Sequence, residues 1–338
     1  MQRLILTILA AFVMALVFGP FAIQWLKKMK FGQTIYELGP QTHQKKQGTP
    51  TMGGVIFAVP AVIATIAFSY KNSSWDFLAI ALVSAVGFGL IGFIDDYIKV
   101  KLKRSLGLTP MQKMIPTLAL AVGLSVWGYF HPEIGPSLIV PFFGVEWNLG
   151  WFYIPFMVFV LVGVTNAANL LDGMDGLLGG CSLINFVTMA LISLLMAVAD
   201  PANADNYLNI AILCGAMVGS LLGFLRFNAH PAMVFMGDVG SFIIGGALAG
   251  VALTTRLSLL LPLVAFAMVA SALSVILQVG YYKATKWYYK TEKGKRIFRM
   301  SPIHYHFELG GMPETRVVAM YYIVTAILCL IALLAFTA

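Results

Sequence analysis

Four short polar motifs interrupt an otherwise apolar chain of 338 residues. They are Asp95-Asp96, Asn169-Leu-Leu-Asp172-Gly-Met-Asp175-Gly176, the stretch from Arg226 to Ser241 that contains Gly237-Asp238, and Ser301-Pro-Ile-His304-Tyr-His306-Phe-Glu308. Carboxylates without nearby cysteines are hard oxygen ligands, which suit Mg²⁺ and disfavour softer metals. Mg²⁺ on a pyrophosphate neutralises the charge that develops in phosphoryl transfer. The motifs therefore indicate Mg²⁺-dependent phosphate chemistry.

The composition predicts that these motifs belong to an all-α polytopic membrane protein. Hydrophobic residues make up 59% of the chain and charged residues only 11%, whereas soluble domains carry about 25% charged residues. A membrane-spanning helix needs about 20 mostly apolar residues, which favours one transmembrane domain over residues 1–338. The chain offers ten such spans, at roughly 4–26, 52–70, 77–94, 111–130, 151–168, 177–198, 207–225, 239–255, 257–282 and 317–338.

The basic residues predict how these spans are oriented. Ten alternating spans place 19 of the 22 Lys and Arg residues on one side of the membrane. The other side, with both termini, holds only Arg3, Lys71 and Arg256. Cytoplasmic loops are enriched in Lys and Arg, so we expect a cytoplasmic cleft and termini on the outer side. This bias also explains the net charge of +8 without a nucleic-acid partner.

All four polar motifs fall on the predicted cytoplasmic side. Taken singly, each has a structural interpretation: a solvated span end, a plain turn, a helix cap or a solvated histidine pair. Together they favour a common site, and on a helix Asp172 and Asp175 would share one face with Asn169. The basic and imidazole groups expected to hold a polyanionic substrate are Lys45, Lys46, Lys113, Arg299, His304 and His306.

Several other chemistries are disfavoured by what the motifs lack. The chain has neither the Asp-rich EF-hand loop nor the glycine-rich loop of P-loop ATPases. Its three cysteines form no C-x-x-C pair, so the pattern indicates neither a zinc site nor a disulfide framework. Segment 131–150 alternates apolar and turn residues, which predicts a short external hairpin.

At these motifs the sequence resembles the phospho-N-acetylmuramoyl-pentapeptide transferases of the polyprenyl-phosphate N-acetylhexosamine-1-phosphate transferase superfamily. The resemblance covers essentially the whole chain, from G-P-Q-T-H-x-K-K-x-G-T-P-T-M-G-G (39–54) to the last span. It includes F-I-D-D-Y (93–97), N-L-x-D-G-x-D-G-L (169–177), P-A-x-V-F-M-G-D-x-G-S (231–241) and S-P-I-H-x-H-[FY]-E (301–308).

The resemblance implies a reaction that composition and spacing do not show. Phospho-MurNAc-pentapeptide passes from UDP-MurNAc-pentapeptide to undecaprenyl phosphate, which gives UMP and lipid I in the first membrane step of peptidoglycan synthesis. The resemblance also implies Mg²⁺ dependence, ten helices, a homodimer and a bacterial cell (inner) membrane location.

The resemblance further implies roles for individual residues. Asp238 is expected to be the main Mg²⁺ ligand, with Asp172 as a catalytic acid and a second ligand. Asp95 and Asp96 are expected near the lipid phosphate, one of them, most often the first, as a base. The expected substrate-binding positions are Lys46, Thr51, Lys113, Asn169, Asp175, Asn228, Phe235, His304 and His306. Among them, Phe235 is expected to stack on uracil, and the two histidines to face the pentapeptide sugar and the diphosphate.

One departure and several alternatives remain. The family usually has three consecutive histidines, whereas this chain has His304-Tyr305-His306, which leaves no titratable imidazole at the middle position. The lipid phosphate is expected to attack the β-phosphorus directly, although a two-step route through an aspartyl-phosphate is an alternative. Other functions compatible with the sequence are a UDP-GlcNAc:polyprenyl-phosphate GlcNAc-1-phosphate transferase and, from another class, a membrane transporter.

Overall fold

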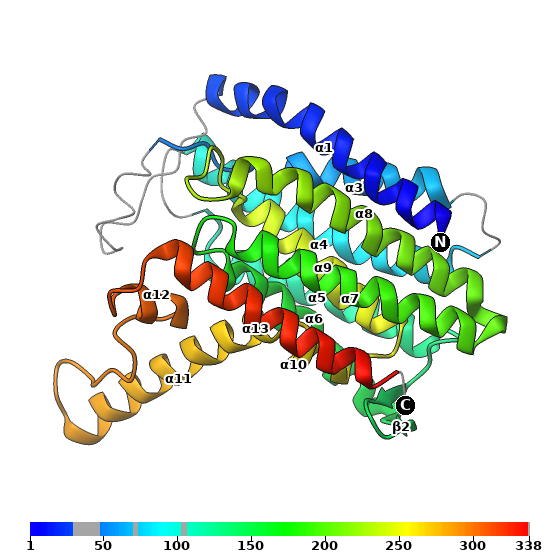
Figure 1. Cartoon of the computed structure of the whole chain (residues 1–338). Helices are drawn as coiled ribbons and strands as arrows, with labels where there is room; N and C mark the ends of the chain where they lie inside the picture. Colours follow the sequence, from blue (N-terminus) through cyan, green and yellow to red (C-terminus); the bar gives the residue numbers. More distant parts are fainter. Residues whose placement is uncertain (30–47, 70–73, 103–106, 337–338) are drawn as a thin grey trace.

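The computed structural model describes residues 1–29, 48–69, 74–102 and 107–336, which form a helical bundle (Figure 1). The long helices are α1 (Gln2–Lys28), α4 (Asp76–Lys101), α5 (Pro110–Phe130), α6 (Tyr153–Leu171), α7 (Leu177–Ala199), α8 (Ala204–Asn228), α9 (Gly237–Thr254), α11 (Phe266–Tyr289) and α13 (Glu314–Leu334). The shorter elements are α3 (Val55–Ser69), α10 (Leu261–Val264), α12 (Ile303–Glu308), the strands β1 (Ser137–Val140) and β2 (Val145–Asn148), and the 3₁₀ turns η1 (Gly150–Phe152), η2 (Pro201–Asn203) and η3 (Ser258–Leu260).

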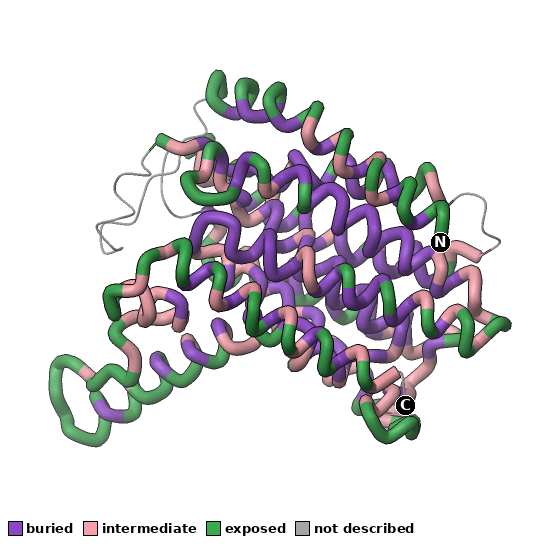
Figure 2. The backbone as a smooth tube through the Cα atoms, viewed as in Figure 1, coloured by how far each residue is buried: buried purple, intermediate pink, exposed green. Residues whose placement is uncertain are grey.

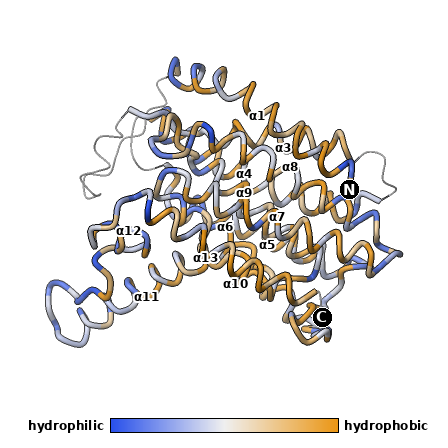
Figure 3. Tube along the Cα trace, in the orientation of Figure 1, coloured by the Kyte–Doolittle hydropathy of each residue, from blue (hydrophilic) through white to orange (hydrophobic). Residues whose placement is uncertain are grey.

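The helix lengths confirm an all-α polytopic membrane protein. Within the described residues, nine helices are long and apolar enough to cross a membrane. The remaining predicted span, 52–70, corresponds to α3, which has 15 described residues and covers roughly 22 Å at 1.5 Å per residue. Hydrophobic residues run along the helices, and hydrophilic residues lie at both ends of the bundle, including the end that carries α12 (Figure 3).

Two helices differ in extent from the sequence prediction. Helix α4 continues to Lys101 instead of ending near residue 94, because Lys99 forms ion pairs with acids three and four residues earlier on the same face. Helix α11 begins at Phe266 and continues to Tyr289. The predicted break near Arg256 is confirmed, since α9 ends at Thr254 and Arg256 has a positive φ of 60°.

The core of the bundle is formed by α8 and α9, whose residues are mostly buried, together with the inward faces of α4 and α7 (Figure 2). Helix α9 packs most extensively against α4, and small residues allow the close approach. A Cβ atom at Gly92 would lie 2.3 Å from the carbonyl oxygen of Asp238, and one at Gly54 would lie 2.4 Å from the Cα of Gly240. Packing of this kind holds helices together in lipid, where burying apolar surface gives little gain.

The predicted hairpin is confirmed at the opposite end of the bundle, where α1 begins and α13 ends (Figure 1). Strands β1 and β2 pair antiparallel, with Val140 opposite Val145. The Arg256 guanidinium donates to both carboxylate oxygens of Glu146, at 2.9 and 3.0 Å. This pair fastens the hairpin to the junction that follows α9.

We predict that Gly92→Ala destabilises the protein because the new methyl group would meet the backbone of α9. Overpacking of this kind costs roughly 1–3 kcal/mol, which exceeds the gain of about 1 kcal/mol from replacing glycine by alanine in a helix. Thermal melting in detergent checks this result. Gly123→Ala in α5 is the control, because nothing lies within 4 Å of its Cβ position. Equal melting temperatures for the two variants would contradict the close contact of α4 and α9.

Candidate active site

Three carboxylates from two helices meet at one end of the bundle. Asp95 and Asp96 lie in α4, and their exposed fractions are only 3% and 2%. Asp238 lies in the first turn of α9. One carboxylate oxygen from each residue lies within 4.8 Å of the others. Because like charges this close repel strongly in a poorly solvated site, the cluster requires cations.

Two ammonium groups provide part of that charge. The Lys99 Nζ lies 2.7 Å from Asp95 Oδ2, 2.7 Å from Asp238 Oδ2 and 3.3 Å from Asp96 Oδ1. The Lys113 Nζ lies 2.7 Å from Asp238 Oδ2 and 3.6 Å from Asp95 Oδ2. Three negative charges against two positive charges leave a net negative site when all five groups are ionised, and such a site attracts a further cation.

Backbone amides fix the two acids of α4. Leu108 N–H donates to Asp95 Oδ1 at 2.8 Å, and Val239 N–H donates to Asp96 Oδ2 at 3.0 Å. Hydrogen bonds from N–H groups to carboxylates are charge-assisted and favour the ionised form. The amide of Val239 lies in the first turn of α9, so Asp96 also fixes the distance between α4 and α9.

Further polar groups surround Asp238. The Asn169 Nδ2 donates to Asp238 Oδ1 at 2.7 Å and to Ser241 Oγ at 3.0 Å. Gly237, with a φ of 75°, precedes Asp238, and a Cβ there would lie 3.0 Å from Thr51 Oγ1. The structure therefore brings together Asn169, Thr51 and Asp238.

Asp172 lies next to this cluster. Removal from water, followed by the negative charges of Asp238 and Asp96, raises the pKa of Asp172 to about 8. The helical spacing predicted for Asp172 and Asp175 is wrong, because α6 ends one residue before Asp172 and a turn follows. We call residues 172–176 the aspartate turn.

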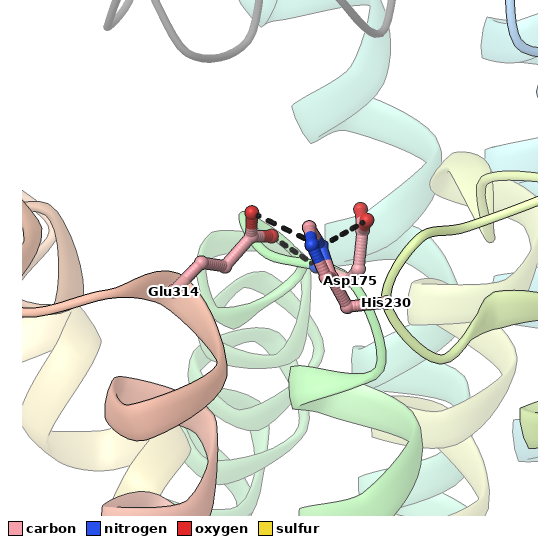
Figure 4. Close-up of side chains that lie close together, drawn as sticks. All are labelled: Asp175, His230 and Glu314. Atoms are coloured by element: carbon pink, nitrogen blue, oxygen red, sulfur yellow. Dashed lines mark hydrogen bonds and ion pairs between the residues drawn. The ribbon is translucent and has the colours of Figure 1, made fainter.

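Asp175 belongs to a second cluster, shown in Figure 4. The His230 Nδ1 lies 3.1 Å from Asp175 Oδ2 and 3.5 Å from Glu314 Oε2. The amide of Ala232 also donates to Asp175 Oδ2, at 3.1 Å. Within the described residues, this cluster and the three aspartates are the two groups with metal-ligand spacing. The second cluster lines a pocket of about 530 Å³ together with Thr49, Glu308 and Thr315.

Two other predicted residues lie on the segment that joins α8 to α9. Asn228 is buried, accepts from the amide of Gly176 at 3.2 Å and donates to the carbonyl of Val234 at 3.0 Å. Its amide therefore holds the aspartate turn against this segment. The backbone of Phe235 pairs with Pro50 and Gly53, and its side chain is half-buried.

The two histidines have different surroundings. His304 is buried and packs on Gly173, where a Cβ would lie 2.3 Å from His304 Nε2. His306 accepts from the backbone amide of Arg299 at 3.1 Å, and its ring packs on aromatic residues of its own loop. The contacts of His306 thus lie away from the three aspartates. Lys46 lies outside the described residues.

Sequence reasoning missed Lys99, His230 and Glu314. For Lys99 a signal existed, because it follows Asp96 by three residues and Asp95 by four, which places the three on one helical face. The prediction that the span ended near residue 94 concealed this spacing. His230 and Glu314 lie 84 residues apart in the sequence and meet only in the fold.

We predict that Lys99→Met destabilises the metal-free protein, since it leaves three carboxylates with one ammonium group. The expected loss is about 2 kcal/mol, below the ~3–5 kcal/mol of a fully buried pair, because the Lys99 side chain is 28% exposed and partly screened. Thermal melting with a chelator measures the effect. Lys101→Met is the matched control, since Lys101 is exposed on the same helix and lies over the Tyr97 ring. Equal melting of both variants would show that Lys99 is dispensable.

The chain matches known families over most of its length. A model of glycosyl transferase family 4 matches residues 77–256. A phospho-N-acetylmuramoyl-pentapeptide-transferase signature matches residues 46–57, which include Thr51 and the close-packed Gly54.

Similar proteins named phospho-N-acetylmuramoyl-pentapeptide-transferase occur in several bacteria. The protein from Clostridium novyi (strain NT) is 45% identical over 334 residues, which cover 99% of this chain and 97% of the relative. The one from Thermoanaerobacter sp. (strain X514) is 46% identical, covering 97% of this chain and 96% of the relative. The one from Clostridioides difficile (strain 630) is 44% identical, with the same coverage. With such identity over nearly the full length, this chain belongs to the phospho-N-acetylmuramoyl-pentapeptide transferases, within glycosyl transferase family 4.

Proposed function

We propose that the protein transfers phospho-MurNAc-pentapeptide from UDP-MurNAc-pentapeptide to undecaprenyl phosphate and so forms lipid I and UMP. This is the first membrane step of peptidoglycan synthesis. The observation that carries the proposal is the convergence of Asp95, Asp96 and Asp238 with two lysines, in a chain of this family. The carboxylates can bind a metal cation and the ammonium groups can bind phosphates, which suits a reaction between phosphate groups that depends on a metal ion.

Mg²⁺ is the proposed cofactor, and the donor set fits it. The three clustered ligands are all carboxylates, with no sulfur or imidazole among them, and Mg²⁺ prefers such oxygen ligands together with substrate phosphates. We assign the ion to Asp238, with Asp172 as the second protein ligand. When bound, the ion neutralises charge on the pyrophosphate. Asn169 supports this assignment, because its donor bond orients one oxygen of Asp238 and leaves the carboxylate in a fixed direction.

The acceptor side of the reaction is assigned to α4 and α5. Asp95 and Asp96 lie near the proposed lipid phosphate, Asp95 as the base. Lys113 and Lys99 supply the positive charge that a phosphate monoester needs on approaching three acids. The second pKa of a phosphate is near 6, so little proton removal is required at neutral pH. Orientation and charge compensation therefore contribute most to a direct attack on the β-phosphorus.

The nucleotide side is assigned to the aspartate turn and its neighbours. Asp175 and Phe235 are the proposed contacts of the nucleotide, with Phe235 stacking on uracil, and the pocket beside Asp175 supports this placement. Asn228 is a further proposed substrate contact, and its amide groups also hold the turn. Lys46, Thr51, Asn169, His304 and His306 complete the proposed substrate-binding set.

Orientation, location and assembly are proposed together. The excess of Lys and Arg on the α12 side supports a cleft that faces the cytoplasm of a bacterial inner membrane. Helix α1 begins and α13 ends at the other end of the bundle, which supports termini on the outer side. The buried cluster that joins nearly all the helices supports a single domain. A homodimer is proposed from the family alone.

We predict that UMP release requires undecaprenyl phosphate, UDP-MurNAc-pentapeptide and Mg²⁺, and stops with EDTA. Asp238→Asn should lower kcat by roughly 10²-fold or more, as when an electrostatic group of a phosphate site is lost. Asp76→Asn is the control, since Asp76 is exposed at the other end of α4. Absence of UMP from the complete mixture would contradict the proposed function. UMP released from UDP-GlcNAc with undecaprenyl phosphate as the acceptor, but not from UDP-MurNAc-pentapeptide, would favour the GlcNAc-1-phosphate transferase.

We also predict that Asp95→Asn lowers kcat by roughly 10²-fold, the low end of the range for a general base, because the phosphate itself is weakly basic. The rate of UMP release between pH 6 and 9 measures this effect. Near-normal turnover across that range would refute the base role. A phosphorylated enzyme trapped with UDP-MurNAc-pentapeptide alone would favour the two-step route over direct attack.

A further inference from the structure

The aspartate turn is bonded to the C-terminal part of the chain at three of its five residues. The Tyr305 hydroxyl of α12 donates to the carbonyl of Gly173 at 3.0 Å. The amide of Asp175 donates to Glu314 Oε1 at 2.8 Å. The Tyr322 hydroxyl of α13 donates to the carbonyl of Gly176 at 2.7 Å. These bonds join segments that lie more than 130 residues apart in the sequence.

Two of these side chains come from the same face of α13. Glu314 and Tyr322 lie eight residues apart on α13, so both point to the same side of the helix. Glycines make room for the partners on the facing segment. A Cβ at Gly173 would lie 2.8 Å from the Tyr305 hydroxyl, and one at Gly180 would lie 2.2 Å from the Tyr322 ring.

Glu314 holds Asp175 at two points. One of its oxygens accepts the backbone amide of Asp175, and the other faces the Nδ1 of His230 at 3.5 Å. The same nitrogen lies 3.1 Å from the Asp175 carboxylate (Figure 4). The position of the Asp175 side chain is therefore linked to α13 both through the backbone and through His230.

These contacts fix the conformation of the aspartate turn, and none of them is made to Asp95, Asp96 or Asp238. The three donor and acceptor groups bond to residues 173–176, whereas Asp95 and Asp96 are fixed by amides of other segments. Loss of one of these contacts should therefore weaken the binding of a ligand at the aspartate turn more than the binding of a ligand at α4.

We propose that Tyr305, Glu314 and Tyr322 are positioning residues that hold the aspartate turn in the conformation that binds the nucleotide-sugar. The inference rests on the proposed function, which places the nucleotide at Asp175. Tyr305 stands where the family usually has histidine, and its hydroxyl reaches the Gly173 carbonyl, which gives this position a bonding role that requires no imidazole. Through these bonds to the turn, the C-terminal segment sets the affinity for the nucleotide-sugar.

The kinetic test uses the full-length protein in detergent. Tyr305→Phe, Tyr322→Phe and Glu314→Ala should each raise the KM for UDP-MurNAc-pentapeptide roughly three- to tenfold, the range for one lost hydrogen bond. The KM for undecaprenyl phosphate should stay within twofold. Glu314→Gln should recover most of the affinity, because its amide oxygen still accepts from Asp175. Tyr288→Phe is the control, since this tyrosine of α11 is 74% exposed and should leave both KM values unchanged.

Amide hydrogen exchange supplies a readout that is independent of activity. Peptides covering residues 169–180 should exchange faster in Glu314→Ala and Tyr322→Phe than in the wild type, and Glu314→Gln should restore slow exchange. Unchanged exchange and unchanged KM would overturn the proposal, as would an equal rise in both KM values. If the wild type releases no UMP, the proposed function fails, while the exchange experiment still decides whether the C-terminal segment holds the turn.

Discussion

The structure depends on keeping three carboxylates together where the bilayer ends. Asp95, Asp96 and Asp238 repel one another, and the burial of the first two leaves little water to weaken the repulsion. They remain together because Lys99 and Lys113 lie among them and because backbone amides bond one oxygen each of Asp95 and Asp96. Since Asp96 bonds to the first turn of α9, the same interactions also hold the two most tightly packed helices in register. The interactions that assemble the candidate site are therefore also interactions that pack α4 against α9.

The arrangement divides the protein into two parts with different tasks. The bundle of α4, α8 and α9 is apolar and closely packed, and it holds the carboxylates rigidly. The aspartate turn is a short irregular segment and depends on side chains from elsewhere for its conformation. Rigid helices suit a site for charged groups that must be held against repulsion. A turn with separate supports suits the binding of a substrate that arrives and leaves in each cycle.

The sequence predicted the architecture well because lipid imposes simple rules on it. Ten apolar stretches and a strong Lys and Arg bias were enough to find the helices and to place the polar motifs at one end. The cluster of Asp95, Asp96 and Asp238 followed from that placement. Details that depend on where a helix stops were harder to predict. Because α4 extends beyond its predicted end, the position of Lys99 beside the two acids was not recognised. Because α6 ends at Leu171, Asp172 and Asp175 lie in a turn and not on a helical face.

Some contacts between distant segments could not be predicted from the sequence. No local pattern links His230 to Glu314, or Tyr322 to Gly176, because their proximity arises only from the packing of α8 and α13 around α7. Asn228 shows the same limit in another way. The resemblance implied a substrate contact for its side chain, and the fold adds that both ends of its amide are bonded within the protein. Only the fold showed these bonding partners.

The filled centre of the bundle also determines how molecules can come and go. Large side chains of α4, α8 and α9 such as Phe88, Phe224 and Phe242 are fully buried there, so no route along the bundle axis is available to a sugar or a peptide between these helices. Under the proposed reaction, both reactants reach the carboxylates from the same face. A product that carries a long polyprenyl tail must then depart sideways, between helices and into the surrounding lipid, while the water-soluble nucleotide returns the way it came.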